Sequence, residues 1–197
     1  VRDVQELGEM HVGRSGYVGF GPIGDGVTTV ALVVPFREAR RGARFFEELD
    51  RFPGVRGRFQ ARHLVRRVLA TGPFARWSRR PVAKGGGALL VGDAVDFFDP
   101  FTGQGIYSAL RGAELAAAAI VGESLGSYAR ARRREFAGKW ILERMIGIAV
   151  GWPALMERVV GRLTRRPHLA DLLVRATGNC VPARAALTPR VLAGLVL

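Results

Sequence analysis

Cysteine and histidine are scarce in this chain of 197 residues, and their scarcity excludes several kinds of site. The single cysteine, Cys180, excludes an internal disulfide framework and a cysteine-rich zinc module. The three histidines, His11, His63 and His168, lie too far apart in the sequence to indicate a histidine metal cluster. We therefore expect no bound metal.

Long apolar runs are missing as well. The longest candidate, Met145–Met156, is shorter than the ~20 residues that a membrane span requires, and it contains two glycines and a proline. The chain begins at Val1 without the charged and apolar regions of a signal peptide. We expect a cytoplasmic globular protein, and we interpret the chain as the C-terminal portion of a longer one.

Lysine is rare although the chain is strongly basic. Lys and Arg together number 30 against 17 Asp and Glu, a formal net charge of +13, and only Lys84 and Lys139 are lysines. The arginines are spread along the chain and are not clustered with aromatic residues, as a nucleic-acid site would require. We expect no nucleic-acid partner, and we interpret the densest run, Arg130–Arg134, as the solvated face of a helix.

The N-terminal part of the chain has the pattern of a small antiparallel sheet. Residues 10–36 predict two or three strands, one of them the β-branched run Val27–Val34. Before this run, Gly24-Asp25-Gly26 has the Asp-Gly pair of a tight hairpin turn. The spacing G-x-G-x-x-G at Gly19–Gly24 matches a dinucleotide-binding loop, but a β-branched run follows it where that loop needs a helix. We therefore interpret it as a glycine-rich hairpin.

The rest of the chain is predicted to be mostly helical. Arg37–Phe52 predicts a helix, and Arg66–Pro73 predicts another strand. The short apolar run Ala88–Val91 has the composition of a strand buried on both faces. Long helices are predicted over Ile106–Val121 and from Leu125 to about Val150, before a tail that prolines divide into short helices.

The most specific pattern lies between the predicted buried strand and the first long helix. The strand ends at Gly92-Asp93, and a loop containing Pro100 and Gly103-Gln104-Gly105 leads into the helix at Ile106. Open α/β sheets bind ligands at the carboxyl ends of their strands, where this acid is predicted to lie. The start of a helix offers unpaired N–H donors, and glycines let a ligand approach the backbone. The pattern therefore predicts a ligand site.

This segment resembles the second flavin-contacting motif of FAD-dependent oxidoreductases with the para-hydroxybenzoate hydroxylase fold. The form Asp99-Pro-Phe-Thr-Gly-x-Gly-Ile106 is most similar to the geranylgeranyl reductase branch, and the resemblance covers about residues 10–122. It implies an α/β fold: the C-terminal part of a Rossmann-like FAD domain with part of an antiparallel substrate-domain sheet. Residues 1–84 would be substrate-domain strands and a connecting helix, 85–123 the returning strand, Gly-Asp loop and flavin-facing helix, and 124–197 a helical tail.

The resemblance also implies roles for individual residues. Asp93 would hydrogen-bond a ribityl hydroxyl of FAD, and Pro100 would lie beside the isoalloxazine ring at the edge of the substrate cavity. The backbone of Gly103, Gln104, Gly105 and Ile106 would lie against the pyrimidine side of the ring. The flavin itself carries the redox step, so no catalytic side chain is assigned. The family's first FAD motif, which binds the ADP half, is absent from this sequence, so we expect the chain alone to bind FAD weakly and to be inactive.

The reaction stays open at this point. The favoured hypothesis is an FAD-dependent oxidoreductase, either a reductase of an isoprenoid-like double bond or a monooxygenase of a small apolar or aromatic substrate, with NAD(P)H as a candidate electron donor. A flavin-dependent halogenase shares the fold. A hypothesis of another class is a non-catalytic basic module at the inner face of a membrane, since apolar residues such as Ile146, Val150 and Leu155 lie beside arginines in the tail. An apolar or lipid-like small molecule is the expected partner.

Overall fold

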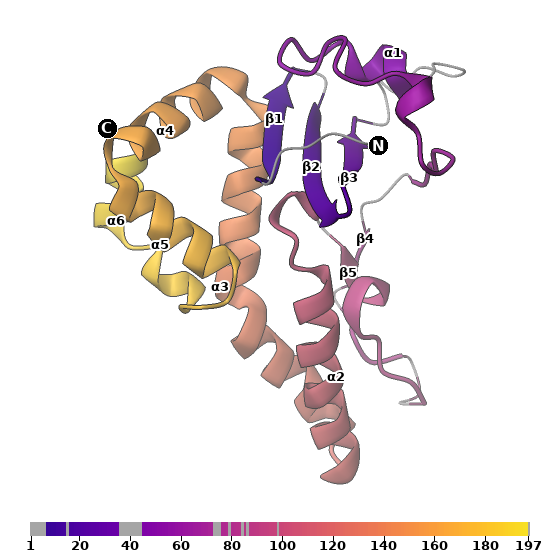
Figure 1. The fold of residues 1–197 in the computed structure, drawn as a ribbon. Coiled ribbons are helices and arrows are strands. Elements are labelled where there is room, and N and C mark those ends of the chain that lie inside the picture. The colour runs from indigo at the N-terminus through magenta and orange to yellow at the C-terminus, as the bar shows by residue number, and fades with distance from the viewer. Residues whose placement is uncertain are drawn as a thin grey trace. The chain divides into compact units, whose positions relative to one another are not determined.

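A computed structural model shows a mixed α/β protein (Figure 1). It describes residues 7–14, 16–35, 45–72, 76–78, 80–83, 85, 87–97 and 99–196. These residues belong to two compact units. The first unit lies within residues 1–73 and 149–156, and the second within residues 74–148 and 157–197.

The first unit contains a three-stranded antiparallel sheet in the order β1 (Glu9–Gly13), β2 (Gly16–Gly24), β3 (Val27–Val33). The predicted strands are thereby confirmed. Asp25 and Gly26 join β2 to β3 with φ angles of 51° and 65°, the left-handed pair that a tight hairpin turn of this kind requires. The G-x-G-x-x-G spacing lies within β2, so its interpretation as a hairpin is confirmed.

The core of the first unit forms between the sheet and the segment that follows it. Its buried apolar residues are Val18, Phe20, Leu49, Phe52, Val55 and Phe59. Helix α1 spans only Phe45–Leu49; residues 37–44 of the predicted helix lie outside the described residues, and residues 50–52 are not helical. The prediction of a strand at residues 66–73 is wrong for residues 66–72, which are irregular, with Val68 and Leu69 exposed. Residue 73 lies outside the described residues. No described strand pairs with this stretch, and a strand needs a partner to satisfy its backbone.

The second unit has little sheet. Strand β4 (Arg76–Trp77) pairs with β5 (Asp96–Phe97), and an isolated antiparallel bridge joins Val82 to Leu89. The prediction that Ala88–Val91 is a strand buried on both faces is wrong, because its residues are half-buried or exposed. A doubly buried strand needs neighbours on both sides, and across the described residues this run has only the bridge to Val82. No parallel sheet is present in that part of the chain.

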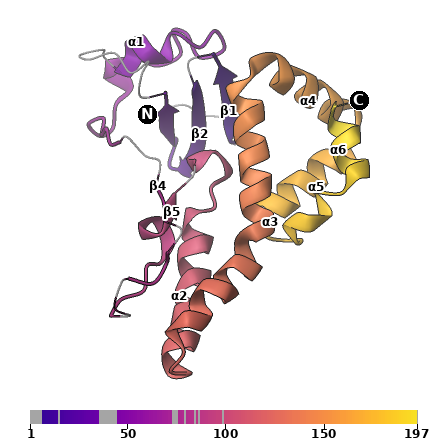
Figure 2. The same ribbon diagram turned by 180° about the vertical axis from the view of Figure 1, so that it is seen from behind.

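Helices form most of the second unit. Helix α2 (Gly105–Val121) and helix α3 (Leu125–Gly151) form a helical hairpin, which confirms both predicted long helices (Figures 1 and 2). Small residues on α2 permit close packing, with Ala116 and Ala119 buried against Tyr128 of α3. The Tyr128 hydroxyl donates a 2.7 Å hydrogen bond to the carbonyl of Leu90, and so ties α3 to the segment that leads into the loop before α2.

The tail consists of short helices that begin at prolines, as predicted. These are α4 (Pro153–Arg165), α5 (Pro167–Thr177) and α6 (Pro189–Val196). Leu142 of α3 packs against Ala176 of α5 and against the segment that follows it. Within the described ranges, no helix combines the length and the apolar character needed to cross a bilayer.

Candidate functional site

The second unit contains a hollow of about 200 Å³ between the loop that follows Gly92, the start of α2 and one face of α3. Six of its lining residues are those that the sequence marks as cofactor-binding: Asp93, Pro100, Gly103, Gln104, Gly105 and Ile106. The structure thus brings all six to one place. Their role in holding a cofactor stays a prediction.

The loop reaches α2 through two local turns. Asp99 accepts a 2.9 Å hydrogen bond from the Phe101 amide and so caps the short 3-10 helix Pro100–Thr102. Gly103 ends that helix with a φ angle of 67°, a left-handed conformation that glycine adopts without strain. Gln104 then precedes the first turn of α2, and its side chain makes no capping hydrogen bond to that turn.

The Asp93 carboxylate lies next to the start of α2. A Cβ atom built on Gly105 would stand 3.8 Å from Asp93 Oδ1, so the absence of a side chain there leaves the carboxylate close to the helix backbone. The first backbone N–H groups of a helix have no partner inside it. The Asp93 carboxylate, which accepts hydrogen bonds, and the first turn of α2, which carries amide donors, therefore border the same hollow.

One wall of the hollow belongs to α3. Arg132 is buried, with 4% of its surface exposed, and its Nη2 forms an ion pair with Asp96 Oδ1. Its guanidinium also lies 5.2 Å from the ring centre of Phe136 and 5.3 Å from that of Trp140. The interpretation of Arg130–Arg134 as a solvated face is therefore wrong for Arg132, because a buried carboxylate and two aromatic rings replace the water around it.

The Arg132–Asp96 pair leaves polar atoms unused. Asp96 Oδ2 and Arg132 Nε are both buried and have no hydrogen-bond partner in the part of the chain that the structure describes. Both residues line the hollow. Buried polar atoms without partners are costly, and a polar ligand would be able to satisfy them.

Lys139 links α3 to the start of α2. Its Nζ donates a 3.0 Å hydrogen bond to Gln104 Oε1 and lies 3.7 Å from the ring centre of Tyr107. Asn179 Nδ2 donates to the same oxygen at 2.9 Å. Burial lowers the pKa of Lys139 to about 8, although Glu143 and Glu135 nearby act in the opposite direction.

Glu143 follows one helical turn after Lys139 and also lines the hollow. Burial raises the pKa of its carboxyl to about 7, Lys139 partly opposes that shift, and the negative charges of Asp96 and Asp99 add to it. The hollow thus has an acid and a base on one helix face that both exchange protons near neutral pH.

The residues of the α3 wall were not predicted from the sequence. One signal was present, since Lys139 is one of two lysines among 30 basic residues, and Glu143 follows it at the spacing that places two side chains on one helix face. The sequence did not show that this helix face lies against a loop some 35 residues earlier in the chain.

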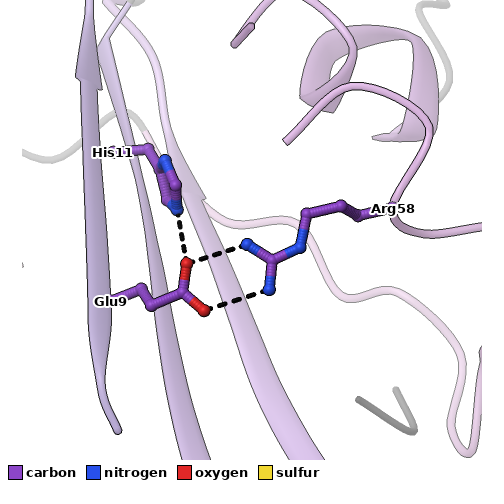
Figure 3. Close-up of polar contacts among 3 residues, drawn as sticks. All are labelled: Glu9, His11 and Arg58. Atoms are coloured by element: carbon purple, nitrogen blue, oxygen red, sulfur yellow. Dashed lines mark hydrogen bonds and ion pairs between the residues drawn. The ribbon is translucent and has the colours of Figure 1, made fainter. Parts of the chain in front are cut away.

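A second polar cluster lies in the first unit (Figure 3). Arg58 donates two hydrogen bonds to the Glu9 carboxylate, at 2.8 Å and 3.0 Å, and His11 Nε2 lies 2.8 Å from Glu9 Oε2. The hydrogen bonds from Arg58 and His11 lower the pKa of Glu9 to about 2. Both oxygens of Glu9 are occupied, and the cluster ties β1 to the segment after α1, so we interpret it as structural.

No family model matches the chain, and no similar curated protein or solved structure was found. The geometry of the hollow and the motif from Asp93 to Ile106 are therefore the features that indicate a function.

Proposed function

We propose that this chain is part of an FAD-dependent oxidoreductase and that the hollow of the second unit holds the flavin portion of the cofactor. The observation that carries the proposal is that Asp93 and the first residues of α2 open into the same hollow. The same proposal includes the finer fold, in which the second unit belongs to a Rossmann-like FAD domain. The three-stranded sheet of the first unit supports its assignment to a substrate domain.

The residues present suit a flavin. The Asp93 carboxylate would accept a hydrogen bond from a ribityl hydroxyl, and the backbone of Gly103–Ile106 would face the pyrimidine side of the ring. Apart from its chain neighbours, no atom of the described residues lies within 4 Å of a Cβ built on Gly103, so this part of the backbone is open to a planar group. Phe136 and Trp140 supply an aromatic wall, on which such a ring can stack.

The electrostatics of the site favour an electron-accepting ligand. The N-terminus of a helix carries roughly +0.5 of an elementary charge and stabilises a nearby anion by ~1–2 kcal/mol in a partly buried place. A flavin gains negative charge on its pyrimidine side when it is reduced, so α2 would stabilise the reduced form relative to the oxidised one. When bound, FAD would supply either hydride transfer or oxygen activation.

The substrate proposed is a small apolar, lipid-like or aromatic molecule. Ile106 is 79% exposed at the edge of the hollow, and an apolar ligand would cover it. Reduction of an isoprenoid-like double bond and monooxygenation both fit this environment, with NAD(P)H as the proposed electron donor. Oxygen consumption measured with and without substrate separates them, since strict coupling of oxygen uptake to substrate would exclude the reductase.

Riboflavin and FAD titrations, followed by flavin fluorescence, test the flavin site itself. Because the chain lacks a motif for the ADP half of FAD, we expect the two ligands to bind with similar affinity. Asp93→Ala should weaken riboflavin binding by about 1–3 kcal/mol, the cost of removing a charged hydrogen-bond acceptor. Asp171→Ala, the same change on the exposed face of α5, serves as the control. Unchanged affinity in the Asp93 variant would remove this residue from the site.

Attachment to a membrane surface is a second candidate, and one observation favours it. Arg158, Arg162 and Arg165 of α4 line another hollow, of about 410 Å³, together with Val196 of α6. Arginines at this spacing share one helix face and suit anionic headgroups. Sedimentation with vesicles containing phosphatidylserine tests this candidate: binding that decreases as salt increases would support it, and equal binding to neutral vesicles would contradict it.

A further inference from the structure

Lys139 and Glu143 are charged residues that line the hollow and have no role in the flavin hypothesis. We propose that they form a proton-exchanging pair that faces the ligand and supplies the proton that accompanies electron transfer in this hollow. The pair itself is inferred from the position of its residues. The proposal that the pair supplies a proton to a redox reaction rests on the proposed function.

The position of Lys139 is the first argument. Residues four apart on a helix project from the same face, and both Lys139 and Glu143 line the hollow. The Lys139 ammonium is held at the start of α2 by Gln104 and lies over the ring of Tyr107. Two groups, the Gln104 side-chain oxygen and the Tyr107 ring, therefore fix this cation where α2 begins.

The groups around Lys139 and Glu143 also affect the protonation of the pair. The charged and titratable groups that face it are Arg132 and Glu135 on α3, Tyr107 on α2, and Asp93, Asp96 and Asp99 on the loop before α2. Asp96 is already paired with Arg132, and Asp99 caps the turn that follows it. Burial consequently remains the largest influence on both members of the pair, and it disfavours the charged form of each.

The consequence is that both groups change protonation in the range where enzymes work. The pKa of Glu143 is raised to about 7 and that of Lys139 is lowered to about 8. A proton donor is most effective when its pKa lies near the working pH. Glu143 and Lys139 meet this condition together.

The proton balance can be written for reduction of a carbon–carbon double bond. Such a reduction adds one hydride and one proton to the two carbons, and the reduced cofactor is the proposed source of the hydride. The Glu143 carboxyl gives its proton to the second carbon and becomes a carboxylate. The Lys139 ammonium restores that proton, and the neutral amine takes another from solvent, so the protein returns to its starting state.

A titration without any ligand tests the pair directly. Carbon-13 NMR of labelled glutamate and lysine side chains is practicable, because the chain contains only two lysines. We expect titration midpoints near 7 for Glu143 and near 8 for Lys139, against ordinary values of 4.5 and 10.5. Midpoints at the ordinary values would overturn the proposal, and this result needs no variant that might fail to fold.

The same titration measures whether the two groups act on each other. Lys139→Met should raise the Glu143 midpoint further, and Glu143→Gln should lower the Lys139 midpoint further, because each change removes an opposite charge. Glu157→Gln, on the exposed surface of α4, should move neither midpoint. If neither variant of the pair shifts its partner, the two groups are independent and the proposal is wrong.

Proton uptake during FAD reduction then tests the service of the pair to the ligand. The chain saturated with FAD is photoreduced by a light flash at pH 7.5, and the rate at which the reduced FAD takes up its proton is followed by absorbance. The total uptake should not differ, because the pair is restored from solvent, but the wild type should protonate the reduced FAD faster than the Lys139→Met/Glu143→Gln variant. Equal rates would overturn this role. Absence of both riboflavin and FAD binding at the highest soluble ligand concentrations would instead overturn the proposed function, and the ligand-free midpoints would then decide for or against the pair.

Discussion

The two units each contain a glutamate beside a cation, and the two glutamates behave in opposite ways. In the first unit, hydrogen bonds from Arg58 and His11 occupy the carboxylate of Glu9 and hold its pKa near 2. In the second unit, Lys139 directs its hydrogen bond to Gln104, and burial raises the pKa of Glu143 to about 7.

The difference shows which interaction decides the charge of a half-buried carboxyl. Direct hydrogen bonds to the charged form outweigh the cost of burial at Glu9, whereas at Glu143 burial outweighs the attraction of a nearby charge. A carboxylate held by two partners keeps its charge at all working pH values and serves to fix the fold. A carboxyl without such partners keeps the ability to exchange its proton near neutral pH.

We expect the largest loss of stability when the buried ion pair between Arg132 and Asp96, in the wall of the hollow, is broken. Arg132→Met leaves the Asp96 carboxylate buried without its cation, and breaking a buried pair in this way costs about 3–5 kcal/mol. Urea unfolding followed by tryptophan fluorescence measures the loss. Arg133→Met is the matched control, because Arg133 is exposed in the same run of arginines. A similar loss in both variants would show that Arg132 has no special role in the second unit.

Breaking the cluster of the first unit should have the next largest effect. Glu9→Gln removes the charge that Arg58 binds through two hydrogen bonds, and we expect a loss of about 1.5–3 kcal/mol in the free energy of unfolding. Glu47→Gln, on an exposed position of α1, should change it little. Stability that does not differ between the two variants would contradict the structural interpretation of the cluster.

The pH dependence of the stability tests the behaviour of Glu9 directly. The pKa of Glu9 is lower in the folded protein, about 2, than its ordinary value of 4.5. Its contribution to stability is therefore complete above about pH 4.5 and is lost as the pH falls toward 2. The difference between wild type and Glu9→Gln should shrink over that interval in acid unfolding experiments, and a constant difference would contradict the assignment.

Local patterns in the sequence predicted the parts of this molecule that local interactions determine. The turn at Asp25-Gly26 requires residues that accept positive φ angles, and the helices from Gly105 and Leu125 follow from their own composition. The predicted strand at Ala88–Val91 failed because burial on two faces depends on neighbours that no local pattern specifies.

The candidate site shows the same division. The loop from Asp93 to Ile106 is continuous in sequence, so its motif was visible before the structure was known. The α3 wall was not visible, because Arg132 and Lys139 have ordinary surroundings in the sequence and meet Asp96 and Gln104 only in the folded unit.

A smaller effect is expected at the turn that delivers the loop to α2. Gly103→Ala places a side chain at a φ angle of 67° where no neighbouring atom obstructs it, so the cost is backbone strain of about 1–2 kcal/mol. Gly147→Ala is the contrasting change, since Gly147 lies inside α3 with open space around it and alanine should stabilise that helix by about 0.5–1 kcal/mol. Thermal unfolding should shift in opposite directions, and shifts of the same sign would refute the assigned geometry of the turn.

The smallest effect concerns the ring beneath Lys139, and it tests whether the proton-exchanging behaviour has a cause besides burial. The ammonium lies 3.7 Å from the ring centre of Tyr107, and such a ring favours the charged form of the lysine by about 0.5–1 kcal/mol. Tyr107→Phe keeps the ring and removes only a 3.3 Å hydrogen bond from the hydroxyl to Glu135, so the NMR midpoint of Lys139 should stay in place. Tyr107→Leu removes the ring, and the midpoint should fall by roughly half a pKa unit. If the Phe and Leu variants titrate alike, the ring contributes nothing to the pKa of Lys139, and burial remains the largest cause of its lowered value.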